Sequence, residues 1–164
     1  MISKKMEAIL NKQMNSELYN SNLYLAMAAW FETQNLTGLA HWMKVQAGEE
    51  CGHAMRFYDH MKERRGVILV SAVPAVPLKY KSPFHAFEEA YKHEVSVSVA
   101  INKMVETASA EKDYATAIML HWFVSEQVEE ESATEAIVQQ LKMAGDSKAS
   151  LMRIDHQFGK RKAA

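Results

Sequence analysis

The sequence predicts an all-α fold, a four-helix bundle with one long crossover and a short fifth helix at its C-terminal end. The chain has 164 residues but only six glycines and three prolines, and charged residues alternate with Leu, Met, Ala and Trp, which suits long helices rather than a turn-rich β fold. Apolar residues recur at spacings of three and four over four long segments. We therefore expect one domain over residues 1–164.

Capping signals set the expected bounds of the helices. Ser3, Ser82 and Asp113 can accept the first backbone N–H groups of a helix, and Pro83 suits a first turn. Glycines end the pattern at Gly66 and after residue 144. The expected helices span 4–33, 38–65, 83–109, 114–143 and 147–158.

The segment 66–81 has two prolines and no helical period. Its valines could form an edge strand, but no partner strand is evident. A helix over 38–65 is about 42 Å long, and the segment, when extended, covers roughly 53 Å. It can therefore return along the whole bundle, which makes the second and third helices parallel. Its valines have little else to bury against, so we expect them to cover a neighbouring subunit.

Composition narrows the function classes. A net charge of −1 gives no bulk attraction to nucleic acid or anionic membranes. The longest apolar runs, such as 26–31, are far too short to span a membrane, and residues 1–6 precede no signal-peptide core. The one cysteine, Cys51, provides neither a disulfide nor a CxxC motif, and we expect its thiol to be buried or half-buried. We expect a cytoplasmic protein that binds neither nucleic acid nor membrane.

The core-facing stripe of each long helix is apolar near its ends but polar near its centre. The polar residues at these centres are Glu17 and Ser21, then Gln46, Glu50 and His53, then Glu94 and Ser98, then Gln127, Glu130 and Thr134. A single inward glutamate could reflect a misjudged register. Several carboxylates buried together cost many kcal/mol unless they share protons or a cation, so the pattern predicts a pair of divalent metals. Carboxylates with one imidazole and no thiolates suit iron or manganese better than structural zinc.

The spacing of these residues predicts which of them bind each metal. Di-metal carboxylate bundles take one glutamate from each of two helices and a Glu-x-x-His from each of the other two. Here Glu17 and Glu94 are the single glutamates, Glu50 and His53 form one Glu-x-x-His, and Glu130 replaces the second histidine. One metal should be bound by Glu17, Glu50 and His53. The other should share Glu50 and add Glu94 and Glu130. The remaining histidines, His93 among them, are interpreted as surface or structural residues.

At these positions the sequence resembles the non-haem bacterial ferritins over nearly its whole length. The motifs that carry the resemblance are Glu17 with Tyr24, Glu49-Glu50-x-x-His53, Tyr91-Lys92-His93-Glu94, and residues 122–131 (WFVSEQVEEE). The resemblance implies a shell of 24 subunits that stores ferric oxyhydroxide. The di-iron ligands that it implies are Glu17, Glu50, His53, Glu94 and Glu130. It also implies that Gln127 lies next to the second iron and that Tyr24 serves as a hydrogen-bonding or electron-donating residue.

The resemblance further implies an additional iron site just inside the shell. Its ligands would be Glu49, Glu126 and Glu129, with Glu130 shared. On sequence alone, a glutamate-rich stretch such as 126–135 is also typical of a solvated helix face.

Related families fit less well. Bacterioferritins carry a haem-binding methionine directly after the first glutamate of the Glu-x-x-His, where this chain has Cys51, so we expect no haem. Rubrerythrins add a CxxC iron domain, and the small DNA-protecting ferritins build their site between subunits. We expect oxidation of two Fe(II) ions by O2 or H2O2. A di-iron oxygenase acting on an organic substrate and a purely structural shell subunit are the alternatives.

The C-terminal region suggests a means of assembly. Leu151, Ile154 and Phe158 form one narrow apolar stripe, and a helix this short needs a packing partner. We expect the partner to be other copies of the chain. The alternative is that the stripe folds back on the end of its own bundle. The basic tail 160–162 is expected to be frayed.

Overall fold

The computed structural model describes residues 1–162, which contain five helices and no strand. The helices are α1 (Lys4–Thr33), α2 (Thr37–Glu63), α3 (Pro83–Ala110), α4 (Tyr114–Ala144) and α5 (Lys148–Phe158). The all-α class is confirmed, although α2 begins at Thr37 and ends at Glu63 instead of spanning 38–65. Residues 163–164 of the expected domain lie outside the described part.

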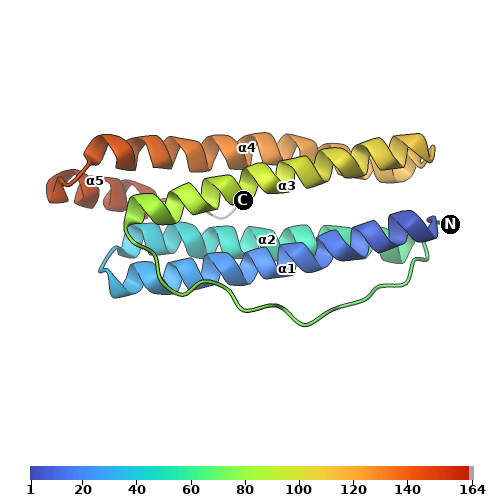
Figure 1. Cartoon of the computed structure of the whole chain (residues 1–164), viewed down its shortest axis with the longest axis horizontal. Coiled ribbons are helices and arrows are strands. Elements are labelled where there is room, and N and C mark those ends of the chain that lie inside the picture. Colours follow the sequence, from blue (N-terminus) through green and yellow to red (C-terminus); the bar gives the residue numbers. More distant parts are fainter. Residues whose placement is uncertain (163–164) are drawn as a thin grey trace.

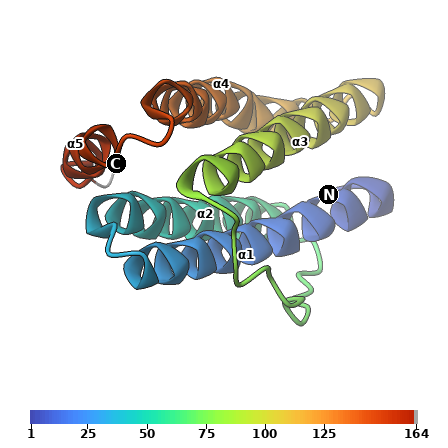
Figure 2. The ribbon, with the colours of Figure 1, turned by 60° about the vertical axis from the view of Figure 1, so that its left-hand side comes forward.

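The four long helices form two antiparallel hairpins, α1 with α2 and α3 with α4, which pack against each other (Figures 1 and 2). Helices α2 and α3 run in the same direction, as expected (Figure 1). Ser3, Ser82 and Asp113 cap their helices through side-chain oxygens that accept backbone N–H groups. At the end of α2 the left-handed residue is Arg65, with φ of 56°, rather than the expected Gly66.

The core is divided into two apolar clusters by a polar belt. Phe31, Trp42 and Phe87 belong to the cluster near α5, whereas Phe57 and Phe123 belong to the cluster at the other end. The buried polar residues at the level between them are Glu17, Asn20, Gln46, Glu50, His53, Glu94, Gln127, Glu130 and Thr134. The expected change from apolar ends to a polar centre is therefore present in the folded chain.

One row of the α3 stripe was placed wrongly. Ser98, which was expected in the core-facing stripe, is only half-buried, and the buried row is Ala90, Val97 and Met104, while Glu94 remains inside. The apolar face of a globular helix is wider than one row, so sequence spacing alone did not separate the central row from its flank.

The crossover from α2 to α3 runs along the outside of α1 for the length of the bundle (Figures 1 and 2). The side-chain amide of Asn11 donates to the carbonyl of Val67 at 2.8 Å, and its oxygen accepts from the N–H of Leu69 at 2.7 Å. Asn15 forms the same two kinds of hydrogen bond one turn later. Its amide donates to the carbonyl of Leu69 and its oxygen accepts from the N–H of Ser71, both at 2.7 Å. The two asparagines are four residues apart, which is about 6 Å along a helix. Their partners on the crossover are two residues apart, which is about 6.6 Å along an extended chain, so each asparagine lies opposite its partners.

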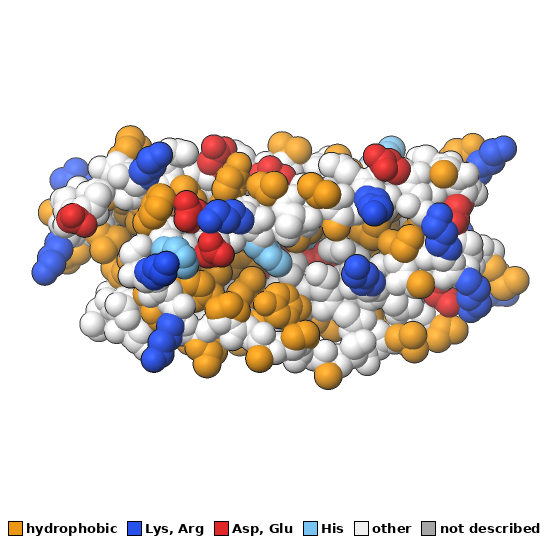
Figure 3. All heavy atoms as spheres, viewed as in Figure 1, with side chains coloured by type: hydrophobic (Ala, Val, Ile, Leu, Met, Phe, Trp, Pro, Cys, Tyr) orange, Lys and Arg blue, Asp and Glu red, His pale blue; other side chains and the backbone are white. Residues whose placement is uncertain are grey.

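The apolar side chains of the crossover lie on the surface, and hydrophobic groups gather along the edge of the face where the crossover runs (Figure 3). Val67, Leu69, Val70 and Leu78 are each more than half exposed. That they cover a neighbouring subunit stays a prediction. In residues 1–162, no helix combines the length and the apolar character that a membrane crossing requires.

The short helix α5 packs against the end of its own bundle, which was the alternative to packing on other copies, and contact of α5 with other copies stays a prediction. Ile154 is buried, and Leu151 and Phe158 pack half-buried on the neighbouring apolar cluster. The N–H of Leu39 donates to the Asp155 carboxylate at 2.8 Å. A Cβ at Gly38 would lie 1.8 Å from the Asp155 carbonyl oxygen, so this close approach requires glycine. The stripe thus completes the apolar cluster near α5.

We predict that Asn11→Ala lowers the free energy of unfolding by about 1–2 kcal/mol, because two crossover backbone groups lose their partners. Urea denaturation measures the loss, and limited proteolysis should cut first within 67–71. Lys12→Ala, which changes the exposed neighbouring residue, is the matched control. Equal stability and equal cleavage in the two variants would contradict a holding role for Asn11.

Candidate metal centre

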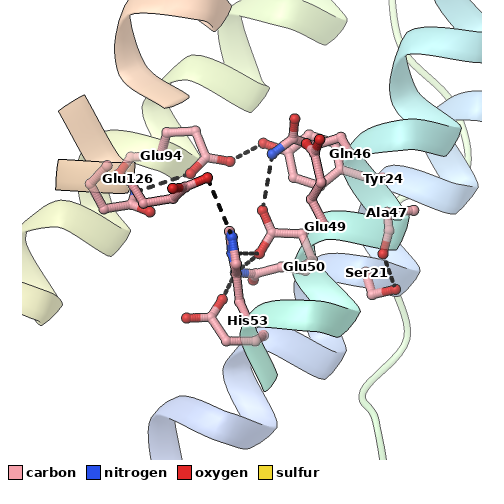
Figure 4. Close-up of polar contacts among 12 residues, drawn as sticks. Ser21, Tyr24, Gln46, Ala47, Glu49, Glu50, His53, Glu94 and Glu126 are labelled. Atoms are coloured by element: carbon pink, nitrogen blue, oxygen red, sulfur yellow. Dashed lines mark hydrogen bonds and ion pairs between the residues drawn. The ribbon is translucent and has the colours of Figure 1, made fainter. Parts of the chain in front are cut away.

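All four long helices contribute to the polar belt. Glu17 comes from α1, Glu50 and His53 from α2, Glu94 from α3, and Gln127 and Glu130 from α4; each is between 1 % and 5 % exposed. Glu50 and His53 project from one face of α2 because they are three residues apart. Figure 4 shows part of this cluster, in which Glu50 and His53 face Glu94 and Glu126 across the bundle.

The structure brings together the three ligands expected for the first metal. One ligand atom each of Glu17, Glu50 and His53 lies within 4.8 Å of the others, and His53 Nδ1 is 3.5 Å from Glu50 Oε2. Metal bonds to such atoms are about 2.0–2.2 Å long. A cation placed between the three atoms could therefore bind all of them after small side-chain movements.

The second expected set is not gathered in the same way. Glu130 instead groups with His53 and Glu126, again with ligand atoms within 4.8 Å, and His53 Nε2 is 3.9 Å from Glu126 Oε1. Both oxygens of Glu94 accept hydrogen bonds, one from the Tyr24 hydroxyl and the other from the Gln127 amide at 3.2 Å. Binding of a second cation would have to exchange these contacts of Glu94 for metal bonds.

Three amide side chains hold the carboxylates of the first position: Gln46, which the sequence pattern already placed at the polar centre of its helix, and Gln13 and Asn20, which it did not single out. Asn20 donates to Glu17 at 2.7 Å and to Glu50 at 3.3 Å. Gln13 donates to the other oxygen of Glu17 at 2.7 Å, and Gln46 donates to Glu50 at 3.2 Å. Each amide lies three or four residues from the glutamate it contacts on the same helix, and this spacing was a signal available in the sequence.

His93 supports this layer from α3, in agreement with its interpretation as structural. Its Nε2 lies 2.8 Å from Asn20 Oδ1, and because an amide oxygen only accepts, the ring donates there. Burial lowers the pKa of His93, so the ring is neutral at neutral pH. The contact orients the Asn20 amide so that its NH2 group faces the carboxylates.

Burial and mutual repulsion keep several of the carboxyl groups protonated. Burial, with the charge of Glu50 second, raises the pKa of Glu17 well above its ordinary value. The same causes raise the pKa of Glu94 to about 8 and contribute to a pKa of about 7 for Glu130. Burial by itself would raise the pKa of Glu50. The contact with His53 outweighs the effect of burial, so that the pKa of Glu50 is lowered. The belt thus holds one ion pair among mostly protonated acids.

Tyr24 keeps its proton for a related reason. Burial, followed by the charge of Glu94, raises the pKa of the phenol well above its ordinary value. Tyr24 is therefore a hydrogen-bond donor toward Glu94 over the whole neutral range.

The residues expected to form a third site lie at the edge of the belt. Glu49 and Glu126 are half-buried, and Glu129 is exposed and outside the two three-ligand groups. The carboxylate of Glu49 forms an ion pair with Arg161. Cys51 is exposed, so the expectation of a buried or half-buried thiol was wrong. Its position follows from the turn of about 100° per residue that separates it from inward-facing Glu50.

We predict that Glu94→Gln stabilises the metal-free protein at pH 8 but not at pH 4.5. The folded state holds the Glu94 proton up to about pH 8, while the unfolded state releases it near the ordinary value of 4.5. Stability is therefore lost as pH rises between these values, and glutamine removes the loss, on the order of 1–3 kcal/mol. Thermal denaturation in the presence of a chelator measures it.

The control for this prediction is Glu135→Gln, which changes an exposed glutamate of α4 and should behave as the parent at both pH values. A stabilisation of equal size at both pH values would mean that the effect does not come from the Glu94 proton.

Comparison with known proteins gives a consistent result. Residues 7–144 match the family described as "Ferritin-like domain". The chain is 43% identical over 161 residues to a "Bacterial non-heme ferritin" of Bacteroides fragilis, covering 98% of this chain and 100% of the relative. It is 36% identical over 158 residues to the protein of that name in Escherichia coli, covering 96% of each.

The fold of the chain also matches solved structures. The crystal structure of an "open pore ferritin" from the archaeon Archaeoglobus fulgidus superimposes with a TM-score of 0.98 at 43% identity, covering 99% of this chain and 100% of that one. An engineered "closed form" of the same ferritin gives the same TM-score and identity, and covers 100% of both chains.

Proposed function

The chain belongs to the ferritin family, whose members store iron, and we propose that it is a ferroxidase. In this proposal the buried carboxylate centre binds two Fe(II) ions as substrates and O2 or H2O2 oxidises them together. The ferric product then moves into the cavity of a hollow homo-oligomeric shell and is stored there as mineral.

The observation that carries the proposal is the convergence of Glu17, Glu50 and His53 in the buried belt, with ligand atoms within 4.8 Å. Reduction of O2 to H2O2 takes two electrons, and each Fe(II) supplies one, so the reaction needs two ions side by side. Glu50 suits a bridging role because its oxygens face different neighbours, Gln46 on one side and His53 on the other. Carboxylates also stabilise the harder Fe(III) product.

The second ion would bind to Glu50, Glu94 and Glu130, with Gln127 beside it. This position is all-oxygen, and its ligand atoms are not gathered as those of the first position are. At neutral pH Glu94 and Glu130, like Glu17 of the first position, must also release the protons that burial keeps on them. Metal binding to such groups is weaker at low pH. We therefore propose a tight first position and a looser second one, an asymmetry that suits iron in transit. Tyr24, through its hydrogen bond to Glu94, would be the residue beside the second ion that donates a hydrogen bond or an electron.

An oxygenase acting on an organic substrate is the main alternative, and it needs a pocket next to the metals. Two of the cavities in the described chain, of 430 Å³ and 570 Å³, are lined by residues other than the proposed ligands. One lies where α3 begins and α4 ends, and the other lies between α2 and the start of α4. Their positions favour iron itself as the substrate.

Assembly into a shell, of 24 subunits in this proposal, is supported by the relatives and by the surface. The Archaeoglobus protein is called an open pore ferritin, and a pore presupposes an enclosed space. The exposed apolar residues of the crossover, Val67, Leu69 and Val70, offer a surface for a second copy. The third iron site at Glu49, Glu126 and Glu129, the absence of haem and the cytoplasmic setting stay predictions.

We predict that Glu50→Gln and His53→Ala each slow the fast oxidation of the first two Fe(II) ions per subunit by about 100-fold or more, because each removes a ligand of the tight position. Stopped-flow absorbance of the ferric product measures the rate, and circular dichroism should show unchanged helix content. Glu135→Gln is the control. Oxidation at the parent rate in both variants would show that the site lies elsewhere.

A redox-inert cation should reveal the asymmetry between the two positions. Calorimetric titration with Zn2+ should give one tight and one weaker class of sites. Glu130→Ala should weaken only the second class, because Glu130 is not among the ligands of the first. Equal affinities in the parent, or loss of both classes in the variant, would contradict the assignment.

A further inference from the structure

The basic tail after α5 is not frayed at Arg161, contrary to the expectation from its sequence. The chain beyond Phe158 turns back toward α2, and the imidazole Nε2 of His41 lies 2.8 Å from the carbonyl oxygen of Arg161. The guanidinium stacks over the Trp42 ring, 4.3 Å from its centroid. These contacts with two adjacent residues of α2 fix both the backbone and the side chain of Arg161.

The stacked guanidinium is directed at the edge of the metal centre. It forms the ion pair with Glu49 and donates a second hydrogen bond to Gln46 Oε1 at 2.9 Å. The amide of Gln46 in turn donates to Glu50 at 3.2 Å. Only one side chain therefore separates the positive charge of Arg161 from the proposed bridging glutamate.

The guanidinium of Arg161 supplies positive charge at one carboxylate of the predicted third site. Glu49 is one of the ligands expected there, and its side chain is 16% exposed while that of Arg161 is 21% exposed. A guanidinium and a metal ion at Glu49 would repel each other at short range, with little water between them.

We propose that Arg161 determines how many iron ions the carboxylate cluster accepts, because its guanidinium takes the outermost cation position at Glu49. The paired positions then fill first, and a third ion binds only when Arg161 withdraws. This inference rests on the proposed function, since it concerns the capacity of the same centre. If Arg161 served only to hold the tail against α2, the opposite result is expected. Replacing Arg161 would then leave the number of bound ions unchanged or reduce it.

The test compares Arg161→Ala and Arg161→Gln with Lys162→Ala in the full-length protein. Lys162 is the exposed neighbouring residue, so its change to alanine alters the net charge equally without touching Glu49. Equilibrium dialysis against Zn2+, followed by metal analysis, gives the number of ions per subunit. The parent and Lys162→Ala should bind two ions at the paired positions, one tightly and one more weakly. Both Arg161 variants should bind a third at least about 10-fold more tightly than the parent does, whereas Arg161→Lys should resemble the parent.

A second pair of variants assigns the additional ion to Glu49. Glu49→Gln alone should leave both paired positions unchanged, whereas Glu49→Gln combined with Arg161→Ala should lose the third ion that Arg161→Ala gains. The inference is overturned if Arg161→Ala binds the same number of ions as Lys162→Ala with the same affinities, or fewer. Zn2+ binding needs no oxidation, so the gain of a third ion supports the role of Arg161 whether or not the parent oxidises Fe(II). Failure of the parent to oxidise Fe(II) would refute only the proposed function.

Discussion

Repulsion among carboxylates buried at one depth of the bundle is the constraint on which the rest of the structure depends. Removing charged groups from water is costly, and like charges at close range add to that cost. The metal-free chain reduces both costs in three ways. It keeps protons on Glu17, Glu94 and Glu130, it pairs Glu50 with His53, and it donates amide hydrogen bonds to the oxygens that remain.

The two apolar clusters make such a belt possible. They lie on either side of it, so the burial of aromatic and methionine side chains at both ends holds the helices together while the centre stays polar. The α1–α2 hairpin supplies the gathered set of Glu17, Glu50 and His53. The α3–α4 hairpin supplies Glu94 and Glu130, which complete the centre only because the crossover lets the hairpins pack with α2 and α3 parallel. The asymmetry of the centre thus follows from which hairpin provides each ligand.

The surroundings of the centre divide it into an inner and an outer part. The inner part is held by neutral amides, with His93 orienting Asn20. At the outer edge, the charge of Glu49 is balanced by Arg161, a residue from the far end of the chain. Helix α5 delivers this arginine, because the packing of Ile154 and the close approach at Gly38 place the tail against α2. In this view the C-terminal segment is part of the centre.

The sequence by itself determined the helices, the length and direction of the crossover, and the depth at which glutamates and His53 interrupt the apolar stripes. These features depend on local propensity and on spacings along one helix, which a sequence records directly. Only the tertiary structure decided which row of α3 faces inward, that Asn11 and Asn15 pair with the crossover, that α5 covers its own bundle, and that Arg161 reaches Glu49. Each of these depends on contacts between residues far apart in the chain, where small differences in helix rotation and distance select the partner.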